Sequence, residues 1–414
     1  MSIAIIGGGA SAMILAAKLK NKEVTIIERN NKLGKKLLLT GNGKCNFTNL
    51  NFENLHEKYN NSFAIEIYKN FNNNSFIDFF NEIGIVPKIE THKGIDYVYP
   101  NSNKSLSVYY CLLDRITFNG VNILYNSFVK EVKKINDKFI VILDSDEKFT
   151  FDKIVLATGG MSYKNTGSDG NGYEIAKSFG HSIVHPMPGL TALKYNFALD
   201  NNKKFSGKCR VNAKVKCHSC KYSFEEFGEI QFSEDTISGI PILNLSNKIC
   251  RNFNNDDCVK INIDFSHSLF ENIKQNRIEK DDIISFLLYR KKNTWYRDVK
   301  DFLSGYLPDE ISELILSFSG IKNIRVSNLT ERDIDRLAKN LVEFEIIIDK
   351  IPSFDNAQIT LGGVDVNEIN INTLESKLVK DLYFSGEVID IDGICGGYNL
   401  QLAYSTASII SKCI

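Results

Sequence analysis

The chain has 414 residues, of which 43% are hydrophobic, so it can bury a large core and form two or three domains. Fifty Lys and Arg residues balance fifty Asp and Glu residues, so the whole molecule lacks the positive field that generic nucleic-acid binding requires. Nine cysteines without a repeating spacing are typical of reduced thiols and predict a cytoplasmic protein. No stretch approaches the roughly 18 apolar residues that a membrane-spanning helix needs, so we expect no membrane partner.

The first thirty residues have the pattern of a strand, a glycine turn, a helix and a second strand. Residues 3–6 are a continuous apolar run, as in a strand buried on both faces, and residues 11–20 favour a helix. Residues 24–27 predict a second buried strand that ends at Glu28. This order predicts a βαβ unit whose turn, residues 7–12, has the form G-x-G-x-x-A.

The glycine turn has the chemistry of a dinucleotide site. Gly7 and Gly9 permit a tight turn, so a diphosphate can approach the amides of Ala10 and Ser11, where the helix dipole favours negative charge. Glu28 follows Gly7 by 21 residues, at the position that binds ribose hydroxyls rather than a 2′-phosphate. These residues are compatible with either NAD or FAD, and the alternative is a chance glycine turn before an ordinary helix.

The middle of the chain differs from both ends. Residues 63–83 predict a helix, and residues 121–157 predict a parallel strand, a small antiparallel meander and a return strand. Beyond Pro186 and Pro188 the chain alternates as short strands, and residues 269–344 then carry helical periodicity. Residues 382–414 return to a strand, a glycine loop and a helix, which predicts one discontinuous domain with an insertion.

Two distant glycine-rich segments favour FAD over NAD. One closes the meander, where flavoproteins bring the chain back beside the dinucleotide, and the other opens the last helix. A helix N-terminus there would stabilise the negative charge of a reduced flavin, which a nicotinamide does not need. The alternative is a glycine-rich loop before a terminal helix. The residues expected at the cofactor are Thr158, Gly159, Gly386, Glu387, Gly397, Asn399 and Leu400.

Six segments carry a family resemblance. In order, they are GGGASAMILAA, KLGKKLLLTGNGKCNFTN, LATGGMSYKNTGSDGNGYEIAKSFGH, ITLGGV, TLESK and LYFSGEVIDIDGICGGYNLQLAYSTA. They resemble the flavoprotein family that includes the BaiN-like oxidoreductases and aminoacetone oxidase, over most of residues 1–195 and 355–414.

The resemblance implies an α/β fold with a Rossmann-like FAD-binding domain of the glutathione-reductase type, an inserted β domain and a helical domain. We expect the FAD-binding domain at residues 1–190 and 355–414. The β domain is then expected at residues 191–266 and 345–354, and the helical domain at residues 267–344.

The resemblance also implies roles for the loop after the second strand. Lys35 and Lys36 would lie near the cofactor phosphates, and residues 40–46 would pass along the diphosphate and the isoalloxazine. Cys45 has no partner cysteine two or three residues away, so we interpret it as a packing residue rather than a redox group. The further cofactor residues expected in this loop and in the meander are Thr40, Gly41, Gly43, Cys45, Asn46 and Val129.

The sequence departs from the family pattern at several positions. Ala12 replaces the usual third glycine, Asn42 replaces a glycine and Lys44 replaces an arginine. Glu234 stands where the family commonly has a histidine, so a substrate role for that histidine has no counterpart here.

Two other patterns suggest competing sites. Cys217 and Cys220 are spaced as half of a zinc site, which Cys209, Cys250 or Cys258 could complete, but no second C-x-x-C follows and we predict no metal. His181 and His185 precede two prolines that disfavour a long helix, so we interpret both as structural or solvent-facing. A basic cluster is interpreted as a solvated face, with an anionic substrate or nicotinamide phosphate as the alternative; it comprises Lys203, Lys204, Lys208, Arg210, Lys214 and Lys216.

Together these patterns predict a FAD-dependent oxidoreductase that transfers hydride to or from flavin N5. No second G-x-G-x-x-G unit is present, so NAD(P)H is expected only as a transient reductant. The sequence identifies a small molecule as the partner class, without its identity, and no catalytic acid or base. The alternatives are a flavin-dependent RNA-modifying protein, a non-catalytic flavin-binding regulator and an NAD-only dehydrogenase.

Overall fold

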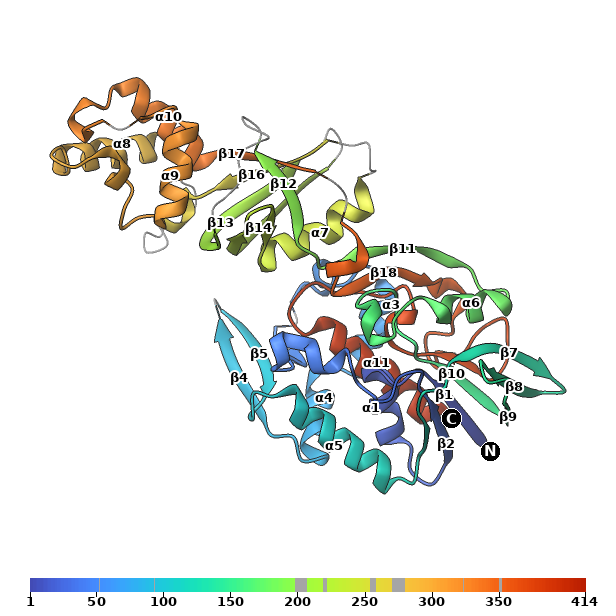
Figure 1. Ribbon diagram of the computed structural model, residues 1–414. Helices are drawn as coiled ribbons and strands as arrows, with labels where there is room; N and C mark the ends of the chain where they lie inside the picture. Colours follow the sequence, from blue (N-terminus) through green and yellow to red (C-terminus); the bar gives the residue numbers. More distant parts are fainter. Residues whose placement is uncertain are drawn as a thin grey trace. The chain divides into compact units, whose positions relative to one another are not determined.

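The structure is a computed structural model (Figure 1). It describes residues 1–51, 53–92, 94–197, 207–218, 222–253, 258–269, 280–322, 324–349 and 352–414. These residues form two compact units, one of residues 1–189 and 354–414 and the other of residues 190–353. The ends of the chain therefore share one unit, and the middle forms the other.

A parallel sheet of five strands is the centre of the first unit. Its order is β19 (Leu382–Phe384), β10 (Lys153–Leu156), β1 (Ser2–Ile6), β2 (Glu23–Ile27) and β6 (Asn122–Leu124). Residues 3–5 of β1 are fully buried, as expected for a strand covered on both faces. The predicted βαβ unit and α/β fold are confirmed, and β10 joins the first strand of the chain to the last.

Helices complete this unit. The long helix α11 (Tyr398–Cys413) packs against α1 (Ala10–Lys18), α3 (Ser62–Asn70) and α4 (Asn73–Glu82), and α5 (Ser105–Phe118) packs against α1 (Figure 1). Two shorter helices are α2 (Leu55–Lys58) and α6 (Asn171–Ser178).

The single helix expected over residues 63–83 is wrong, because α3 and α4 are separate. Asn72 lies between them and caps α4, since its side chain accepts a hydrogen bond from the Ser75 N–H at 3.2 Å.

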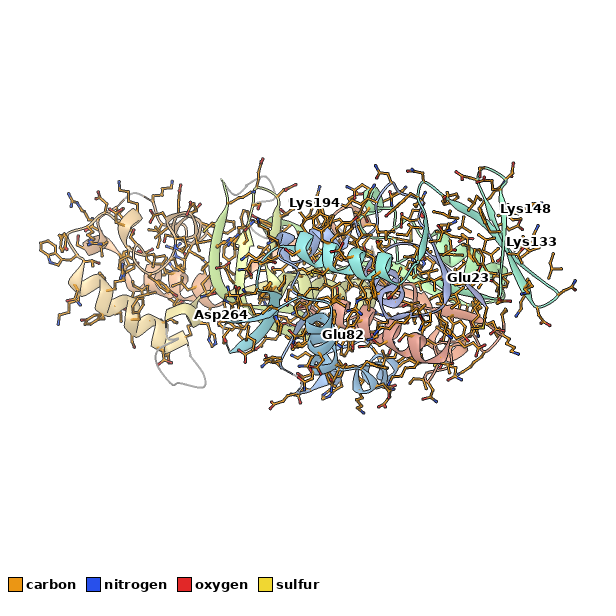
Figure 2. The ribbon with its side chains drawn as sticks, turned by 90° about the horizontal axis from the view of Figure 1, so that it is seen from below. Glu23, Glu82, Lys133, Lys148, Lys194 and Asp264 are labelled. Atoms are coloured by element: carbon orange, nitrogen blue, oxygen red, sulfur yellow. The ribbon has the colours of Figure 1, made fainter. Side chains whose placement is uncertain are left out.

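Three small sheets surround the main one. The predicted meander is present as β7 (Val129–Ile135), β8 (Lys138–Leu143) and β9 (Lys148–Phe151), and it exposes Lys133 and Lys148 (Figure 2). The others are β3 (Thr48–Asn49), β5 (Ile95–Pro100) and β4 (Pro87–His92), and the pair β11 (Ile183–Gly189) and β18 (Ile359–Val364).

The second unit contains a closed antiparallel barrel. Its strands, in order, are β12 (Leu193–Phe197), β15 (Thr236–Ser238), β14 (Ser223–Phe232), β13 (Cys209–His218), β16 (Val259–Asp264) and β17 (Phe344–Ile348). Alternate residues of β13 are buried, which is the period of two expected for a strand with one face in the core. Helix α7 (Ile240–Asn252) packs on β14.

Between the barrel strands β16 and β17, the part of the chain that the structure describes contains three α-helices: α8 (Lys280–Asn293), α9 (Asp309–Phe318) and α10 (Glu331–Val342). Thr330 caps α10, because its hydroxyl oxygen accepts the Asp333 N–H at 3.2 Å, and the Thr330 N–H donates to Asp333 Oδ2 at 2.8 Å. Barrel and helices share one hydrophobic core, so a separate helical domain stays a prediction. Among the residues placed in the structure, no helix has the length and apolarity to cross a membrane.

Lys18 lies in an aromatic cluster between α1, α4 and α11. The rings of Phe76 and Tyr404 stack at 4.3 Å, and the Lys18 ammonium lies 4.3 Å from the centre of the Phe79 ring and 4.9 Å from that of Tyr404. Burial lowers the pKa of Lys18 from 10.5 to about 8, because the ammonium loses hydration that the rings replace only in part.

We expect Lys18→Met to stabilise the protein at pH 7. The unfolded lysine takes up its proton near pH 10.5 and the folded one only near pH 8, so wild-type stability falls as pH decreases through this window. The variant should lose that slope and unfold roughly 2–4 °C higher at pH 7 in thermal denaturation. The control Lys20→Met, at an exposed ion pair with Glu82, should keep the slope. A lower melting temperature for Lys18→Met with the slope intact would contradict this.

Candidate cofactor site

Three turns lie at the carboxyl edge of the parallel sheet, where ligands of such sheets bind. They follow β1, β10 and β19, which run in the same direction. Gly7 and Gly386 have φ of +97° and +73°. A Cβ on Gly7 would lie 2.6 Å from the Ala157 carbonyl oxygen, and one on Gly386 would lie 2.7 Å from Ser11 Oγ. Glycine is therefore required at both positions by conformation and by space.

The N-terminus of α1 is open. Gly9 caps the helix without a side-chain hydrogen bond, and no atom lies within 4 Å of the position that its Cβ would occupy. The first amides of the helix, including those of Ala10 and Ser11, have no partner within the helix. Open space beside Gly9, amides without a partner in the helix and the positive end of the dipole together fit a diphosphate.

Glu28 braces the glycine turn at the end of β2. Its side chain is buried, and Oε2 accepts the Gly8 N–H at 2.7 Å. Oε1 accepts the backbone N–H and the side-chain amide of Asn30, at 2.7 and 2.6 Å. A carboxylate has about four acceptor positions, so one remains for a ribose hydroxyl. The Ser127 N–H donates to the Glu28 carbonyl at 2.9 Å, which brings the strand of Val129 beside this residue.

Both lysines expected near the phosphates have protein partners in this structure. Lys35 Nζ donates to Asn30 Oδ1 at 2.9 Å. Lys36 Nζ donates to Ser162 Oγ at 2.6 Å and to Glu387 Oε2 at 2.8 Å. Lys36 and Glu387, which were both expected to contact the cofactor, therefore form an ion pair with each other.

The loop after Lys36 is tightly turned. Gly41, Asn42, Gly43 and Cys45 all have positive φ, between +52° and +82°. A Cβ on Gly41 would lie 2.8 Å from the Asn46 amide nitrogen, so the turn closes on itself there. In the orientation that satisfies its hydrogen bonds, the Asn46 side chain donates to the carbonyls of Thr48 and Val98.

Cys45 is fully buried in this loop. Its N–H donates to the Thr40 carbonyl at 3.0 Å, and the Thr40 hydroxyl donates to the Leu37 carbonyl at 2.7 Å. Burial raises the pKa of the Cys45 thiol to about 12, so the thiol is protonated at neutral pH and is a poor nucleophile.

We expect Cys45 to resist alkylation in the folded protein. At pH 8, iodoacetamide should label Cys258, which is exposed, and leave Cys45 unlabelled until the protein is unfolded. Peptide mass spectrometry measures both sites in one sample. Cys45→Ala should unfold with a free energy lower by about 1 kcal/mol, as for an ordinary packing residue. Rapid labelling of Cys45 in the native state would contradict a packing role.

The loop before α11 meets the loop of Cys45. Gly397 has φ of +91°, and a Cβ there would lie 2.8 Å from Thr48 Cα. The Thr48 hydroxyl donates to Gln401 Oε1 at 2.7 Å, and the Asn49 side chain donates to the Gly396 carbonyl at 2.8 Å. The segment after the Cys45 loop and the segment that begins α11 are therefore in contact, and both adjoin residues expected at the cofactor.

The N-terminus of α11, like that of α1, has no side-chain cap, although Thr48 packs closely on Gly397. Gly397 caps it without a side-chain hydrogen bond. Asn399 closes the preceding loop, because its side chain accepts the Gly393 N–H and donates to the Gly393 carbonyl, both at 2.9 Å. Leu400, in the first turn, is half-buried. The positive end of this helix dipole therefore has no side-chain acceptor as its cap.

Sequence reasoning missed Ser162 and Thr360, which both contact Glu387. Ser162 Oγ donates to Glu387 Oε1 at 3.0 Å, and the Thr360 N–H donates to the same oxygen at 2.9 Å. Both belong to segments that carry the family resemblance, since Ser162 lies in MSY and Thr360 in ITLGGV. The sequence motifs therefore included these residues but did not indicate what either side chain does.

The described residues provide little support for the alternative zinc site and anion site. Cys220, Lys203 and Lys204 lie outside the described residues, and within those residues no group of three or more His, Cys, Asp or Glu side chains could hold a metal ion. On β13, Lys214 and Lys216 pair with Glu225, and Arg210 pairs with Glu229 at 3.5 Å. These cross-strand pairs neutralise much of the basic cluster.

His181 is a buried structural residue, and His185 is exposed. His181 Nδ1 lies 3.0 Å from Glu368 Oε2, and Nε2 lies 2.7 Å from Ser376 Oγ. Ser376 Oγ already accepts the N–H groups of residues 378 and 379, so its proton is directed at Nε2, and a neutral imidazole donates Nδ1–H to Glu368. Burial lowers the pKa of His181 below 6.5.

We expect stability to fall as pH decreases through 6.5. The unfolded His181 binds a proton there while the folded one stays neutral, so acid favours the unfolded state. His181→Asn should be about 1–2 kcal/mol less stable at pH 8 and should lose this slope in denaturant titrations. The control His185→Asn should retain both the stability and the slope. Protonation of Glu368, which would weaken its contact with His181, occurs only at lower pH, because the pKa of this carboxyl is below 4.5.

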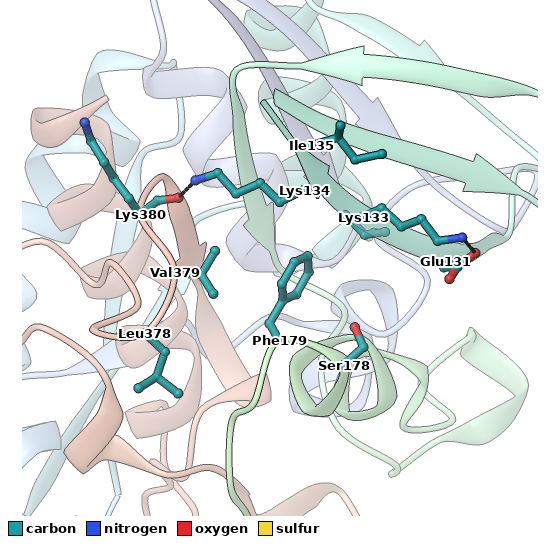
Figure 3. A pocket seen from close by; sticks show the side chains of 10 residues that line it. Glu131, Lys133, Lys134, Ile135, Ser178, Phe179, Leu378, Val379 and Lys380 are labelled. Carbon is teal, nitrogen blue, oxygen red and sulfur yellow. Dashed lines mark hydrogen bonds and ion pairs between the residues drawn. The ribbon is translucent and has the colours of Figure 1, made fainter. Parts of the chain in front are cut away.

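An open hollow of about 630 Å³ lies elsewhere in the first unit (Figure 3). Its walls come from β7, the end of α6 and residues 378–380. Lys134 Nζ donates to the Lys380 carbonyl, and Lys133 pairs with Glu131 at 3.0 Å. No expected cofactor residue lines it, so it is separate from the candidate site.

Comparisons with known proteins cover nearly the whole chain. A family model described as HI0933-like protein Rossmann domain matches residues 1–413. The chain is 32% identical over 420 residues to a 3-dehydro-bile acid delta(4,6)-reductase of Clostridium scindens, covering 99% of this chain and 98% of that protein. It is 28% identical to a ribosomal RNA dihydrouridine synthase of Haemophilus influenzae, covering 97% and 96%, and 27% identical to one of Escherichia coli, covering 97% and 95%. The likeness therefore spans both compact units.

Proposed function

The chain belongs to the HI0933-like family of Rossmann-domain proteins, and from that premise we propose that it reduces a small unsaturated carbonyl compound. It is a FAD-dependent oxidoreductase. The relative with 32% identity is named as a reductase of a 3-dehydro bile acid, and that name supports both the direction of the reaction and the substrate class.

The observation that carries the proposal is the contact between the N-terminal segment and the C-terminal segment of the chain. Helices α1 and α11 pack together, and each begins at a glycine without a side-chain cap. In the proposed complex, α1 and Glu28 hold the diphosphate and the ribose, while residues 40–46 and the start of α11 face the ring. Bound FAD supplies hydride transfer at N5, which no side chain can provide.

NAD(P)H is the proposed source of electrons. The sequence contains no second G-x-G-x-x-G unit, so the nicotinamide would bind transiently rather than in a domain of its own. The uncapped N-terminus of α11 would then stabilise the negative charge that reduction places on the ring.

Anaerobic titration tests this proposal. The purified protein should be yellow, should bleach with NADH or NADPH, and should regain its colour when a conjugated enone is added. A saturated ketone of the same skeleton serves as the control and should leave the protein bleached. A colourless protein that takes up no added FAD would contradict the proposal, and so would a yellow protein that no enone reoxidises.

A second candidate is reduction of a base in RNA. Two relatives of 27–28% identity are named ribosomal RNA dihydrouridine synthases, and this favours the candidate. The balanced charge of the chain and the paired cations of β13 weigh against it. Salt-sensitive binding of ribosomal RNA, with loss of at least tenfold in affinity between 50 and 200 mM salt, would support the candidate.

A further inference from the structure

An exposed aromatic surface lies at the end of α8, in the second unit (Figure 1). Among the described residues, five aromatic side chains are more than half exposed, and three of them lie within eight residues of the sequence. These three, Tyr289, Trp295 and Tyr296, are 70%, 61% and 54% exposed. Apolar surface that is concentrated in this way is typical of a binding surface, whereas single exposed apolar residues are common on any protein.

Cations accompany these rings. Residues 289–300 contain five Lys or Arg residues and one acidic residue. Lys292, Arg297 and Lys300 are exposed, and within the described residues none of them forms an ion pair with a carboxylate. The Arg297 guanidinium lies 6.0 Å from the centre of the Tyr296 ring. The surface therefore has an excess of positive charge beside its aromatic groups, and we call the three rings and these three cations the aromatic patch.

The backbone under the aromatic patch is anchored. The Trp295 carbonyl accepts the Ser327 N–H at 3.2 Å. The Arg325 guanidinium donates to the Tyr296 carbonyl at 2.7 Å. Arg325 also pairs with Asp298, the one acidic residue of the segment, at 3.6 Å. Because protein contacts hold this backbone and engage its acid, the rings and cations are presented to a partner without a prior ordering step.

The geometry of the rings favours a lipid surface over single-stranded RNA. The rings of Trp295 and Tyr296 lie 6.1 Å apart and are nearly perpendicular, at 89°. Neighbouring stacked bases are parallel to one another, so two of them would not both lie flat on these rings. The Asn293 amide, which could bond to the edge of a base, instead donates to the Tyr289 carbonyl at 2.9 Å.

We propose that the aromatic patch binds the surface of an anionic lipid membrane. Trp and Tyr prefer the boundary between headgroups and hydrocarbon, where the ring is in an apolar medium and its N–H or O–H stays hydrated. Exposed Lys and Arg side chains are attracted to anionic headgroups. Such peripheral contact requires no spanning helix, so this inference replaces the expectation, drawn from the lack of a long apolar stretch, that the protein has no membrane partner. It does not depend on the cofactor or on the substrate.

Trp295 provides the test, because it is the single tryptophan of the chain. Its emission should shift to shorter wavelength when the full-length protein is mixed with vesicles of phosphatidylglycerol and phosphatidylcholine, since the ring leaves water. Vesicles of phosphatidylcholine alone should bind about tenfold more weakly, and added salt should weaken binding to the anionic vesicles. Trp295 emission that anionic vesicles leave unchanged would overturn the inference.

Variants of the aromatic patch separate its apolar and ionic contributions. Tyr296→Ser keeps the fluorescent reporter and should bind anionic vesicles about fivefold more weakly, because half of a ring no longer leaves water. Lys292→Gln with Lys300→Gln should bind them about tenfold more weakly or worse, because two charges are lost. Co-sedimentation with vesicles measures the affinity, and the melting temperature of each variant verifies the fold.

Matched controls come from the first unit. Phe118 is 85% exposed, so Phe118→Ser removes an aromatic ring that is more accessible than Tyr296. Lys22 and Lys380 are also exposed, so Lys22→Gln with Lys380→Gln removes the same charge as the double patch variant. Both controls should bind anionic vesicles as the wild type does.

Three further results would overturn the inference. One is vesicle binding that neither patch variant weakens, because the contact would then lie elsewhere. Another is quenching of Trp295 by oligouridine without any shift on vesicles, which would assign the aromatic patch to RNA. The third is a shift that depends on protein concentration in the absence of lipid, which would assign the aromatic patch to contact with a second copy of the chain.

Discussion

The pairing of β10 with both β1 and β19 is the constraint on which the first unit depends. It places the first strand of the chain two positions from the last in one parallel sheet. Because parallel strands end at the same edge, the turns after all three strands face the same region. Every feature of the candidate site, from Glu28 to the start of α11, is built around this edge.

Close approach at that edge explains why its glycines cannot be replaced. Gly7 and Gly386 need positive φ and also lack room for a Cβ, and Gly160 lacks room because the side chains of Thr360 and Glu387 lie there. The negative charge of Glu387 is balanced by Lys36 within the protein, and in the proposed complex α1 would bind the diphosphate through its amides and its dipole. Burial raises the pKa of Cys45 and lowers the pKa of His181, so each side chain favours its neutral form. Both residues therefore contribute to packing and hydrogen bonding in the interior.

Much of this could be predicted because the responsible signals are local. The apolar run of β1, the glycine turn after it and the acid at the end of β2 are adjacent in sequence, and each has a direct physical cause. The division at residues 71–72 was missed because apolar residues continue on both sides, while the Asn72 side chain caps the second helix. Ser162 and Thr360 were missed because neither has a distinctive chemistry until Glu387 lies beside it.

The sequence by itself determined the βαβ unit and the family, since these depend on periodicity and on motifs that each lie within a short segment. Only the tertiary structure decided that Lys36 is bound to Glu387 and that Thr48 lies against Gly397. Such pairings join residues about 350 positions apart, and hydrophobic burial brings them together without leaving a trace in local sequence. A lysine beside a glycine loop is a phosphate ligand or an ion-pair partner depending on where a distant carboxylate lies.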